Sequence, residues 1–238
     1  MRNAVLPPNV VKQAARSGIR IRGLHMTFAA PSVIELLAAD LDFVYIDGEH
    51  GCFDARDVEA ACIAAERHDL TAIARVPDSS SATITHFLDR GVQGIIVPHI
   101  ETVQQARDAV AATYYAPLGE RSFGGSRPAF LAIVDKPAHM QACNAATSLC
   151  LMIESAAGVA AAGALAAVEG VDYLSFGMMD LAQALGHSGD PGHPEVRQAV
   201  EKATAAVHDA GKCVREDFMR FGWINDIIVA GSRQFLAA

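Results

Sequence analysis

The sequence lacks the features that would place it on a membrane or on a nucleic acid. No apolar run approaches the roughly 20 residues of a membrane-spanning helix, and residues 1–8 contain no signal-peptide core. Lys and Arg form no cluster, and the formal net charge is −8. Because nucleic acids and anionic lipids attract basic surfaces, we expect neither as a partner. We expect a soluble, cytoplasmic protein.

Cysteine is scarce, and its spacing matches no metal or disulfide motif. The five cysteines are an odd number and include no C-x-x-C pair, which argues against a zinc knuckle and a disulfide framework. Cys150 and Cys213 lie in apolar runs typical of core strands. Cys52 follows His50 by two residues and could be a nucleophile, but no neighbouring group suggests a stabilised thiolate. A packing role is therefore favoured.

The composition favours one large α/β domain. The chain has 238 residues, of which 51% are hydrophobic, which suits a barrel of roughly 250 residues. Apolar runs of four to eight residues alternate with longer Ala-rich segments of helical period, the pattern of a parallel sheet with crossover helices. We predict a single-domain TIM (β/α)8 barrel over residues 1–238. The predicted strands are 20–27, 43–47, 71–75, 93–97, 149–153, 172–176, 212–214 and 226–230, and the predicted helices are 31–39, 54–67, 80–90, 102–111, 156–167 and 194–210.

Two longer segments interrupt this alternation. One runs from about 112 to 147 and is rich in glycine and aromatic residues near its start, and the other covers 185–194. Long loops in compact domains are usually functional, so we expect these two to select the substrate. Residues 233–238 leave room for only a stub of helix after the predicted eighth strand.

Charged side chains follow four of the predicted strands. In α/β barrels the carboxyl ends of the strands build the active site. Four strand ends with charged groups therefore predict one site assembled from distant parts of the chain. The groups are Asp47, Glu49 and His50 after the second strand, Arg75 after the third, Glu154 after the fifth and Asp180 after the sixth.

Two of these carboxylates suit a divalent metal. Glu154 and Asp180 are hard oxygen ligands, appropriate for Mg²⁺ or Mn²⁺ completed by water and substrate. The alternative is that each carboxylate merely caps the next helix, and for Glu154 alone the two interpretations are balanced. Their position on consecutive strands favours the metal, because neighbouring strand ends lie close enough to share one ion.

Three further side chains are candidates for roles beside that metal. Arg75 is placed to bind an anionic or carbonyl oxygen, the alternative being a structural ion pair. His50 is the natural general base, because its intrinsic pKa is near neutrality. Asp89 ends a predicted helix, where the helix dipole disfavours a carboxylate, and this hints at another use.

Taken together, these segments resemble the HpcH/HpaI family of metal-dependent (class II) pyruvate aldolases, typified by 2,4-dihydroxyhept-2-ene-1,7-dioate aldolase. The resemblance covers roughly residues 20 to 212, and its motifs are specific only in combination. They are Ile46-Asp47-Gly48-Glu49-His50, Ala74-Arg75-Val76, the segment 88–98, Ile153-Glu154 and Gly177-x-x-Asp180-Leu181-x-x-x-Leu185-Gly186.

The resemblance implies a barrel within a homohexamer and a metal held by Glu154 and Asp180. That metal would hold the carboxylate and keto oxygens of pyruvate. Backbone N–H groups around Met179 and Asp180, next to Gly177, would receive the carboxylate. The Gly119-x-Arg121-Ser122 segment resembles the family's glycine-arginine loop near the substrate entrance, so Arg121 is a predicted substrate contact.

The same resemblance assigns the proton chemistry. Arg75 would contact the keto oxygen, His50 would act as base with Asp89 as its partner, and Glu49 would orient a metal-bound water. Removing a methyl proton of pyruvate leaves an enolate, whose charge a divalent cation and Arg75 would stabilise. No predicted strand end carries a lysine for a Schiff base, which agrees with the metal-dependent class.

Some positions depart from the family pattern. Gly177-Met178-Met179-Asp180 stands where the family usually has Gly-Pro-x-Asp, and Met152 stands where many members have Gln. The section after Lys212 departs as well. These differences leave the metal and the base intact but leave the substrate open.

The leading hypothesis is an aldolase that cleaves or forms a 4-hydroxy-2-oxo acid, with pyruvate or a close 2-oxo acid and an aldehyde as the other partners. One alternative is a lyase or synthase acting on oxaloacetate or an acyl-CoA thioester. Another is a silent binding protein that keeps the barrel, which would be expected to lose His50, Arg75 or a metal carboxylate. The aldehyde stays open, as does the ion, since Mg²⁺, Mn²⁺ and Co²⁺ all accept two carboxylates and water.

Overall fold

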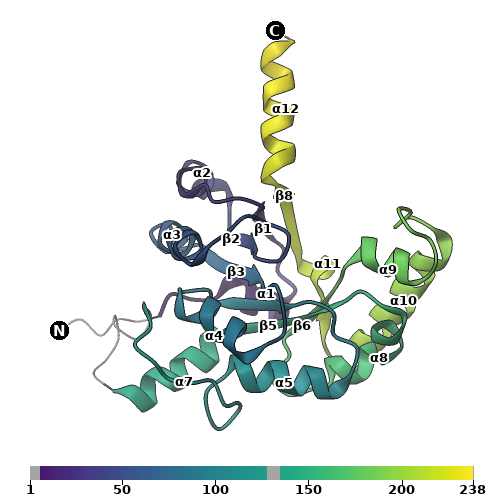
Figure 1. Ribbon diagram of the computed structural model, residues 1–238, viewed down its shortest axis with the longest axis horizontal. Coiled ribbons are helices and arrows are strands. Elements are labelled where there is room, and N and C mark those ends of the chain that lie inside the picture. The colour runs from purple at the N-terminus through teal and green to yellow at the C-terminus, as the bar shows by residue number, and fades with distance from the viewer. Residues whose placement is uncertain (1–5, 128–134, 238) are drawn as a thin grey trace.

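Eight parallel strands form the sheet in the computed structural model, which describes residues 6–127 and 135–237 (Figure 1). The strand order is β7-β6-β5-β4-β3-β2-β1-β8, so successive strands pair and β8 returns to pair with β1. This arrangement confirms the predicted α/β barrel-type fold. The strands are β1 (Ile21–Met26), β2 (Phe43–Asp47), β3 (Thr71–Arg75), β4 (Gly94–Val97), β5 (Ser148–Ile153), β6 (Tyr173–Phe176), β7 (Cys213–Val214) and β8 (Met219–Trp223).

The sheet curls but stays open between β7 and β8. Among the described residues no ladder joins these two strands. β7 has two residues, and only the four-residue helix α11 (Arg215–Phe218) separates it from β8. Parallel neighbours need a crossover of about a dozen residues or more. The connection is therefore too short to pair β7 with β8, and closure is incomplete there.

Alternate residues of each strand face the inside of the curled sheet. Phe43 and Tyr45 pack in the inner cluster with Ile73 and Cys150, whereas residues 44 and 46 pack outward against the helices. Strands buried on both faces explain the continuous apolar runs in the sequence. Because the side-chain period is two, the charged residues at the strand ends extend the inner face toward the barrel mouth.

Six predicted helices are confirmed, with ends that differ by a few residues. Side chains of Asp54, Ser80, Thr102 and Ser155 accept hydrogen bonds from backbone N–H groups in the first turn of the helix that follows each. Such caps satisfy donors that a helix leaves free at its start. The helices are α2 (Pro31–Leu37, continued by the 3₁₀ turn Ala38–Asp40), α3 (Ala55–Glu66), α4 (Ser81–Asp89), α5 (Val103–Thr113), α8 (Ala156–Ala166) and α10 (Pro194–Asp209).

In the part of the chain that the structure describes, three helices besides the short α11 and the C-terminal helix lie where the sequence predicted none. α1 (Val10–Ser17) packs Val11 and Ala14 into the inner cluster. Asn9 caps it and also donates hydrogen bonds of 2.8 Å to the carbonyls of Gln93 and Ala146. α7 (Lys136–Ala146) lies within the segment predicted as a long loop, and α9 (Met178–Ala184) directly follows β6.

The prediction of the eighth strand at 226–230 was wrong. Those residues belong to helix α12 (Ile224–Leu236), which is 13 residues long rather than a stub, and the strand lies at Met219–Trp223. The run Ile227-Ile228-Val229 suits either a strand or one face of a helix, and a short apolar run does not distinguish the two. The preceding residues pair with β1 over Ile21 to His25 instead.

Helix α12 projects away from the rest of the molecule, and the C-terminus lies at its tip (Figure 1, yellow). Its apolar side chains Ile227, Ile228, Val229, Phe235 and Leu236 are all exposed, the last two by 81% and 80%. Within the described residues, no helix is both long and apolar enough to cross a membrane.

Candidate active site

A continuous series of polar side chains crosses the carboxyl ends of five neighbouring strands. It starts on β1 and ends after β5, and each step is a hydrogen bond or ion pair of 2.6–3.4 Å. Residues that are distant in the chain thus meet at the barrel mouth, as the strand-end pattern predicted. In spatial order the series is His25, Asp47, Arg75, Glu49, His99 and Glu154.

Asp47 and Arg75 form a buried bidentate ion pair. Arg75 Nε lies 3.0 Å from Asp47 Oδ1, and Nη2 lies 2.6 Å from Oδ2. Asp47 Oδ1 also accepts the backbone N–H groups of Glu49 and His50, each at 3.2 Å. Burial alone would raise the pKa of Asp47, but the hydrogen bonds from His25 and Arg75 outweigh it and hold that pKa well below its usual range. The structural ion pair considered for Arg75 is thus present, and it aims the guanidinium.

The third nitrogen of Arg75 reaches Glu49. Nη1 lies 3.0 Å from Glu49 Oε2 as an ion pair, and this buried oxygen accepts no hydrogen bond within the described residues. The other oxygen, Oε1, lies 3.2 Å from Nε2 of His99. Glu49 therefore joins the arginine to the side of the mouth where Glu154 lies.

His99 was not predicted as a site residue, yet it contacts two carboxylates. Its backbone N–H donates to Glu154 Oε1 at 3.0 Å, and its ring Nδ1 lies 3.4 Å from the same oxygen. Its φ of 56° lies in the left-handed region, which is strained for a residue with a side chain and often marks a functional position. The signal was available, because His99 stands two residues past the predicted fourth strand.

Glu154 is a buried carboxylate in a space that only glycine leaves open. It is 4% exposed. A Cβ placed on Gly177 would lie 2.7 Å from Glu154 Cδ and closer still to Oε2. Burial raises the pKa of Glu154, the carboxylates of Glu49 and Asp180 raise it further, and the N–H of His99 opposes them.

Asp180 lies in the first turn of α9, directly after Gly177, the N-cap of that helix. It is half-buried, and Met179 beside it is 57% exposed. The first backbone N–H groups of a helix have no partner inside the helix. The N–H of Gly177 donates to the carbonyl of Ile153 at 3.0 Å, so the donors beside the two carboxylates are the N–H groups of Met179 and Asp180.

A divalent cation fits this donor set. Burial raises the pKa of Glu154, and the nearby carboxylates of Glu49 and Asp180 raise it further, so a positive ion beside Glu154 would be favourable. Oxygen ligands of this kind suit Mg²⁺, Mn²⁺ or Co²⁺. Glu154 and Asp180 would hold the ion, and Gly177 leaves the room that the Glu154 carboxylate needs.

His50 lies at the edge of this site. Its backbone N–H is fixed by Asp47, while its side chain is 64% exposed with Nε2 4.0 Å from Glu49 Oε2. An accessible imidazole on a fixed backbone can reach a substrate without first breaking a strong contact. This geometry is compatible with a general base.

Asp89 and Arg121 lie elsewhere in the chain. Arg121 Nη2 lies 2.8 Å from Asp89 Oδ1 at the end of α4. Arg121 lines a cavity of about 100 Å³ together with Gln93 and Thr147, which precede β4 and β5 and so lie at the opposite end of the sheet from Glu154. Within the described part of the chain, Asp89 makes no hydrogen bond or ion pair with His50.

His25 is a second residue that the sequence did not reveal. It is 3% exposed, its Nε2 lies 3.2 Å from Asp47 Oδ2, and its ring stacks between Tyr45 and Trp223 at 4.3 and 3.8 Å. Burial lowers its pKa, and because a carboxylate can only accept, Nε2 donates to Asp47. Its Nδ1 is buried without a hydrogen-bond partner. A histidine in mid-strand gives no signal by its spacing alone.

A family model and several known proteins match this chain. The model described as HpcH/HpaI aldolase/citrate lyase matches residues 22–219. A hydroxypyruvate/pyruvate aldolase from Roseovarius nubinhibens is 33% identical over 87% of this chain and 80% of the relative. A crystal structure of an HpcH/HpaI aldolase/citrate lyase family protein from Burkholderia cenocepacia is 31% identical over 96% of this chain and 98% of that chain, with a TM-score of 0.87. The crystal structure of macrophomate synthase is 26% identical over 99% and 92% of the two chains, with a TM-score of 0.83.

The polar side chains at the strand ends lie where enzymes with an α/β barrel build their active sites. The chain belongs to the HpcH/HpaI aldolase/citrate lyase family, so the resemblance seen in its motifs is confirmed.

We predict that Gly177→Ala displaces the Glu154 carboxylate, because the new Cβ would overlap it. Affinity for Mn²⁺, measured by calorimetric titration, should fall by at least tenfold while the circular dichroism spectrum is unchanged, since misplacement by about 1 Å is costly at such sites. Gly124→Ala is the matched control, because a Cβ there meets nothing within 4 Å. Equal Mn²⁺ affinity in both variants would contradict the role of Gly177.

Proposed function

We propose that this chain is a divalent-metal-dependent aldolase that cleaves or forms a 4-hydroxy-2-oxo acid, with pyruvate or a close 2-oxo acid and an aldehyde as the other partners. The observation that carries the proposal is the buried Glu154 carboxylate, which lies against Gly177 and faces Asp180 and Glu49. The similarity to a hydroxypyruvate/pyruvate aldolase supports a 2-oxo acid as one partner.

Each residue of the site has a role in this reaction. A cation held by Glu154 and Asp180 would supply the Lewis acid that stabilises an enolate. Arg75, fixed by Asp47, would donate to the keto oxygen of the substrate, and His50 would remove the methyl proton. Backbone N–H groups of Met179 and Asp180 would bind the substrate carboxylate.

Glu49 contacts Arg75 on one side and His99 on the other. From that position it would orient a metal-bound water. In the aldol direction the proton that His50 holds would return to the new alkoxide oxygen. Arg121 and Asp89 would reach a substrate only at the mouth of another copy, because their own chain places them at the other end of its sheet.

A lyase or synthase acting on oxaloacetate or an acyl-CoA thioester is the second candidate, and the likeness to macrophomate synthase favours it. The complete Asp47-Gly48-Glu49-His50 segment supports the aldolase instead, since thioester-using relatives generally lack it. Oxaloacetate and acyl-CoA thioesters therefore belong in the assay described next.

The first test of the function is release of pyruvate from a panel of 4-hydroxy-2-oxo acids. We expect turnover that EDTA abolishes and that Mg²⁺, Mn²⁺ or Co²⁺ restores. Glu154 and Asp180 are themselves negative, so only the cation that they hold would stabilise the negative charge of an enolate. Asp180→Ala should remove both activity and metal binding with the fold intact. Full activity in the stripped, chelated protein would sink the metal assignment, and turnover of only oxaloacetate or a thioester would favour the second candidate.

Proton exchange tests His50 without knowledge of the aldehyde. His50→Ala should keep metal and pyruvate binding but slow deuterium incorporation into the pyruvate methyl group by about 10²–10⁴-fold, the usual contribution of a general base. Asp89→Asn should have a milder effect, because it removes only an orienting partner. His208→Ala is the control, since His208 pairs with Asp217 on the surface. Undiminished exchange in His50→Ala would transfer the base role to Glu49.

We also infer that the protein is a homo-oligomer, with a hexamer as the expected state, and that α12 docks on a second copy. The sequence left room for only a stub of helix after the predicted eighth strand. In the structure the helix α12 is 13 residues long and projects from its own sheet with five apolar side chains exposed. Exposed apolar patches of this kind usually mark an interface.

Light scattering at micromolar concentration tests the assembly. We expect a particle several times the 25.1 kDa chain mass, and Ile228→Asp together with Val229→Asp should shift it toward the monomer by placing charges on the docking face. Ser232→Asp, on the same exposed helix, is the control. A wild-type protein that is monodisperse at the chain mass and active on dilution would show that α12 needs no partner.

A further inference from the structure

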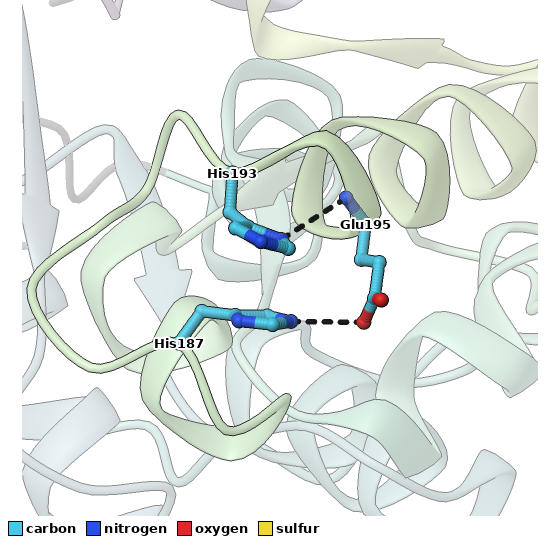
Figure 2. Close-up of side chains that lie close together, drawn as sticks. All are labelled: His187, His193 and Glu195. Carbon is cyan, nitrogen blue, oxygen red and sulfur yellow. Dashed lines mark hydrogen bonds and ion pairs between the residues drawn. The ribbon is translucent and has the colours of Figure 1, made fainter.

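We propose that His187, His193 and Glu195 form a second cation site, for a borderline divalent ion of the Zn²⁺ class. The three residues lie between α9 and the first turn of α10, in the loop that follows Asp180 (Figure 2). Among residues 6–127 and 135–237 they are the one trio of His, Cys, Asp or Glu whose ligand atoms all lie within 4.8 Å of one another. Neither Glu154 nor Asp180 belongs to it.

The loop backbone fixes the two histidines before any ion arrives. Gly186, with φ of 85°, ends α9, and the N–H of His187 donates to the carbonyl of Ala182 at 2.8 Å. The N–H of His193 donates to the carbonyl of Asp190 at 3.1 Å. A site held by its backbone loses less conformational entropy on binding. The loop therefore brings three residues with the spacing His-x₅-His-x-Glu close together in space.

The ligand atoms lie within 4.8 Å of one another, but the two histidine rings are stacked, so one ring must turn before both can direct an in-plane lone pair at one ion. The two imidazole rings are stacked with centroids 3.5 Å apart, and Nε2 of His187 lies 2.9 Å from Oε2 of Glu195 (Figure 2). Zn²⁺ with bonds of about 2.0–2.2 Å places tetrahedral ligand atoms roughly 3.3 Å apart. One pair is already near that separation. Glu195 is largely exposed, so its carboxylate can rotate to complete the set.

Helix capping explains part of this cluster without any ion, but it does not explain the second histidine. His193 accepts the N–H of Glu195 at 3.3 Å as an N-cap, and Glu195 lies in the first turn of α10, where the helix dipole favours a carboxylate. These roles need one histidine and one acid. His208 and Asp217 form such a simple pair at 2.8 Å, without a third group.

The chemistry of the set selects the ion. Two imidazoles and one carboxylate, with a fourth position left to water, are typical of zinc sites and bind Mg²⁺ or Ca²⁺ poorly. The positive end of the α10 dipole opposes a cation, and the Glu195 carboxylate offsets it. An ion here would tie the end of α9 to the start of α10 and so order the segment 185–194, which we expect to shape the substrate entrance.

The test uses the full chain carrying Glu154→Gln and Asp180→Asn, so that the proposed active-site metal cannot bind and the outcome does not depend on the aldolase activity. Titration with ZnCl₂ in a calorimeter should show one equivalent bound, and excess Mg²⁺ should not displace it. CoCl₂ should give a visible absorption band characteristic of mixed nitrogen and oxygen ligands.

Adding His187→Ala to this protein should weaken Zn²⁺ binding by at least tenfold, whereas His208→Ala should leave it unchanged. Glu195→Gln, which keeps the side-chain shape, serves if His187→Ala fails to fold. The proposal is overturned if the double variant binds no Zn²⁺, if Mg²⁺ competes on equal terms, or if His187→Ala and Glu195→Gln both bind Zn²⁺ as tightly as the His208→Ala control.

Discussion

The ion pair between Asp47 and Arg75 is the interaction on which the barrel mouth depends. Asp47 accepts from His25, from two nitrogens of Arg75 and from the backbone N–H groups that begin the Glu49-His50 turn. Removing two charges from water costs several kcal/mol per ion, and only a geometry that satisfies all lone pairs repays it. Five donors around one carboxylate meet that condition. Loss of one partner would leave the other buried and unpaired, so the pair keeps the arginine oriented rather than adding net stability.

The strand ends were predictable from sequence, and their mutual contacts were not. Apolar runs followed by charged residues located Glu49, Arg75 and Glu154, because a parallel sheet brings the ends of its strands to one edge. His25 escaped notice because a histidine inside a strand has no distinctive spacing. His99 stands two residues past the predicted fourth strand, so its place at the mouth was accessible from sequence, but its contacts depend on a left-handed backbone turn that the sequence does not reveal. The fold class could also be predicted from the sequence, because the alternation of apolar strand and helix patterns is a local property of the chain.

The two largest differences come from tertiary context. The apolar run at 227–229 was predicted as a strand because strands are usually buried, yet here it lies on a helix with exposed apolar side chains. In our proposal a second copy covers these side chains, and a burial rule applied to one chain does not include such a surface. The prediction for Asp89 and Arg121 also depends on contacts outside one chain. The two residues pair at the end of the sheet opposite Glu154, so they cannot act at the barrel mouth of their own chain. A single sequence carries no direct record of which contacts cross between copies.

The raised pKa of Glu154 couples the proposed cation to folding. A carboxylate whose pKa in the folded protein exceeds its value in the unfolded chain binds more protons when folded. In the absence of a cation, Glu154 is therefore least unfavourable at low pH, and stability falls as pH rises from its ordinary pKa of 4.5 through the folded value. The divalent ion proposed for this site would replace that proton and offset the repulsion from Glu49 and Asp180. Proton and cation would then compete for one buried carboxylate, so the proposed ion would bind more tightly as pH rises toward neutrality.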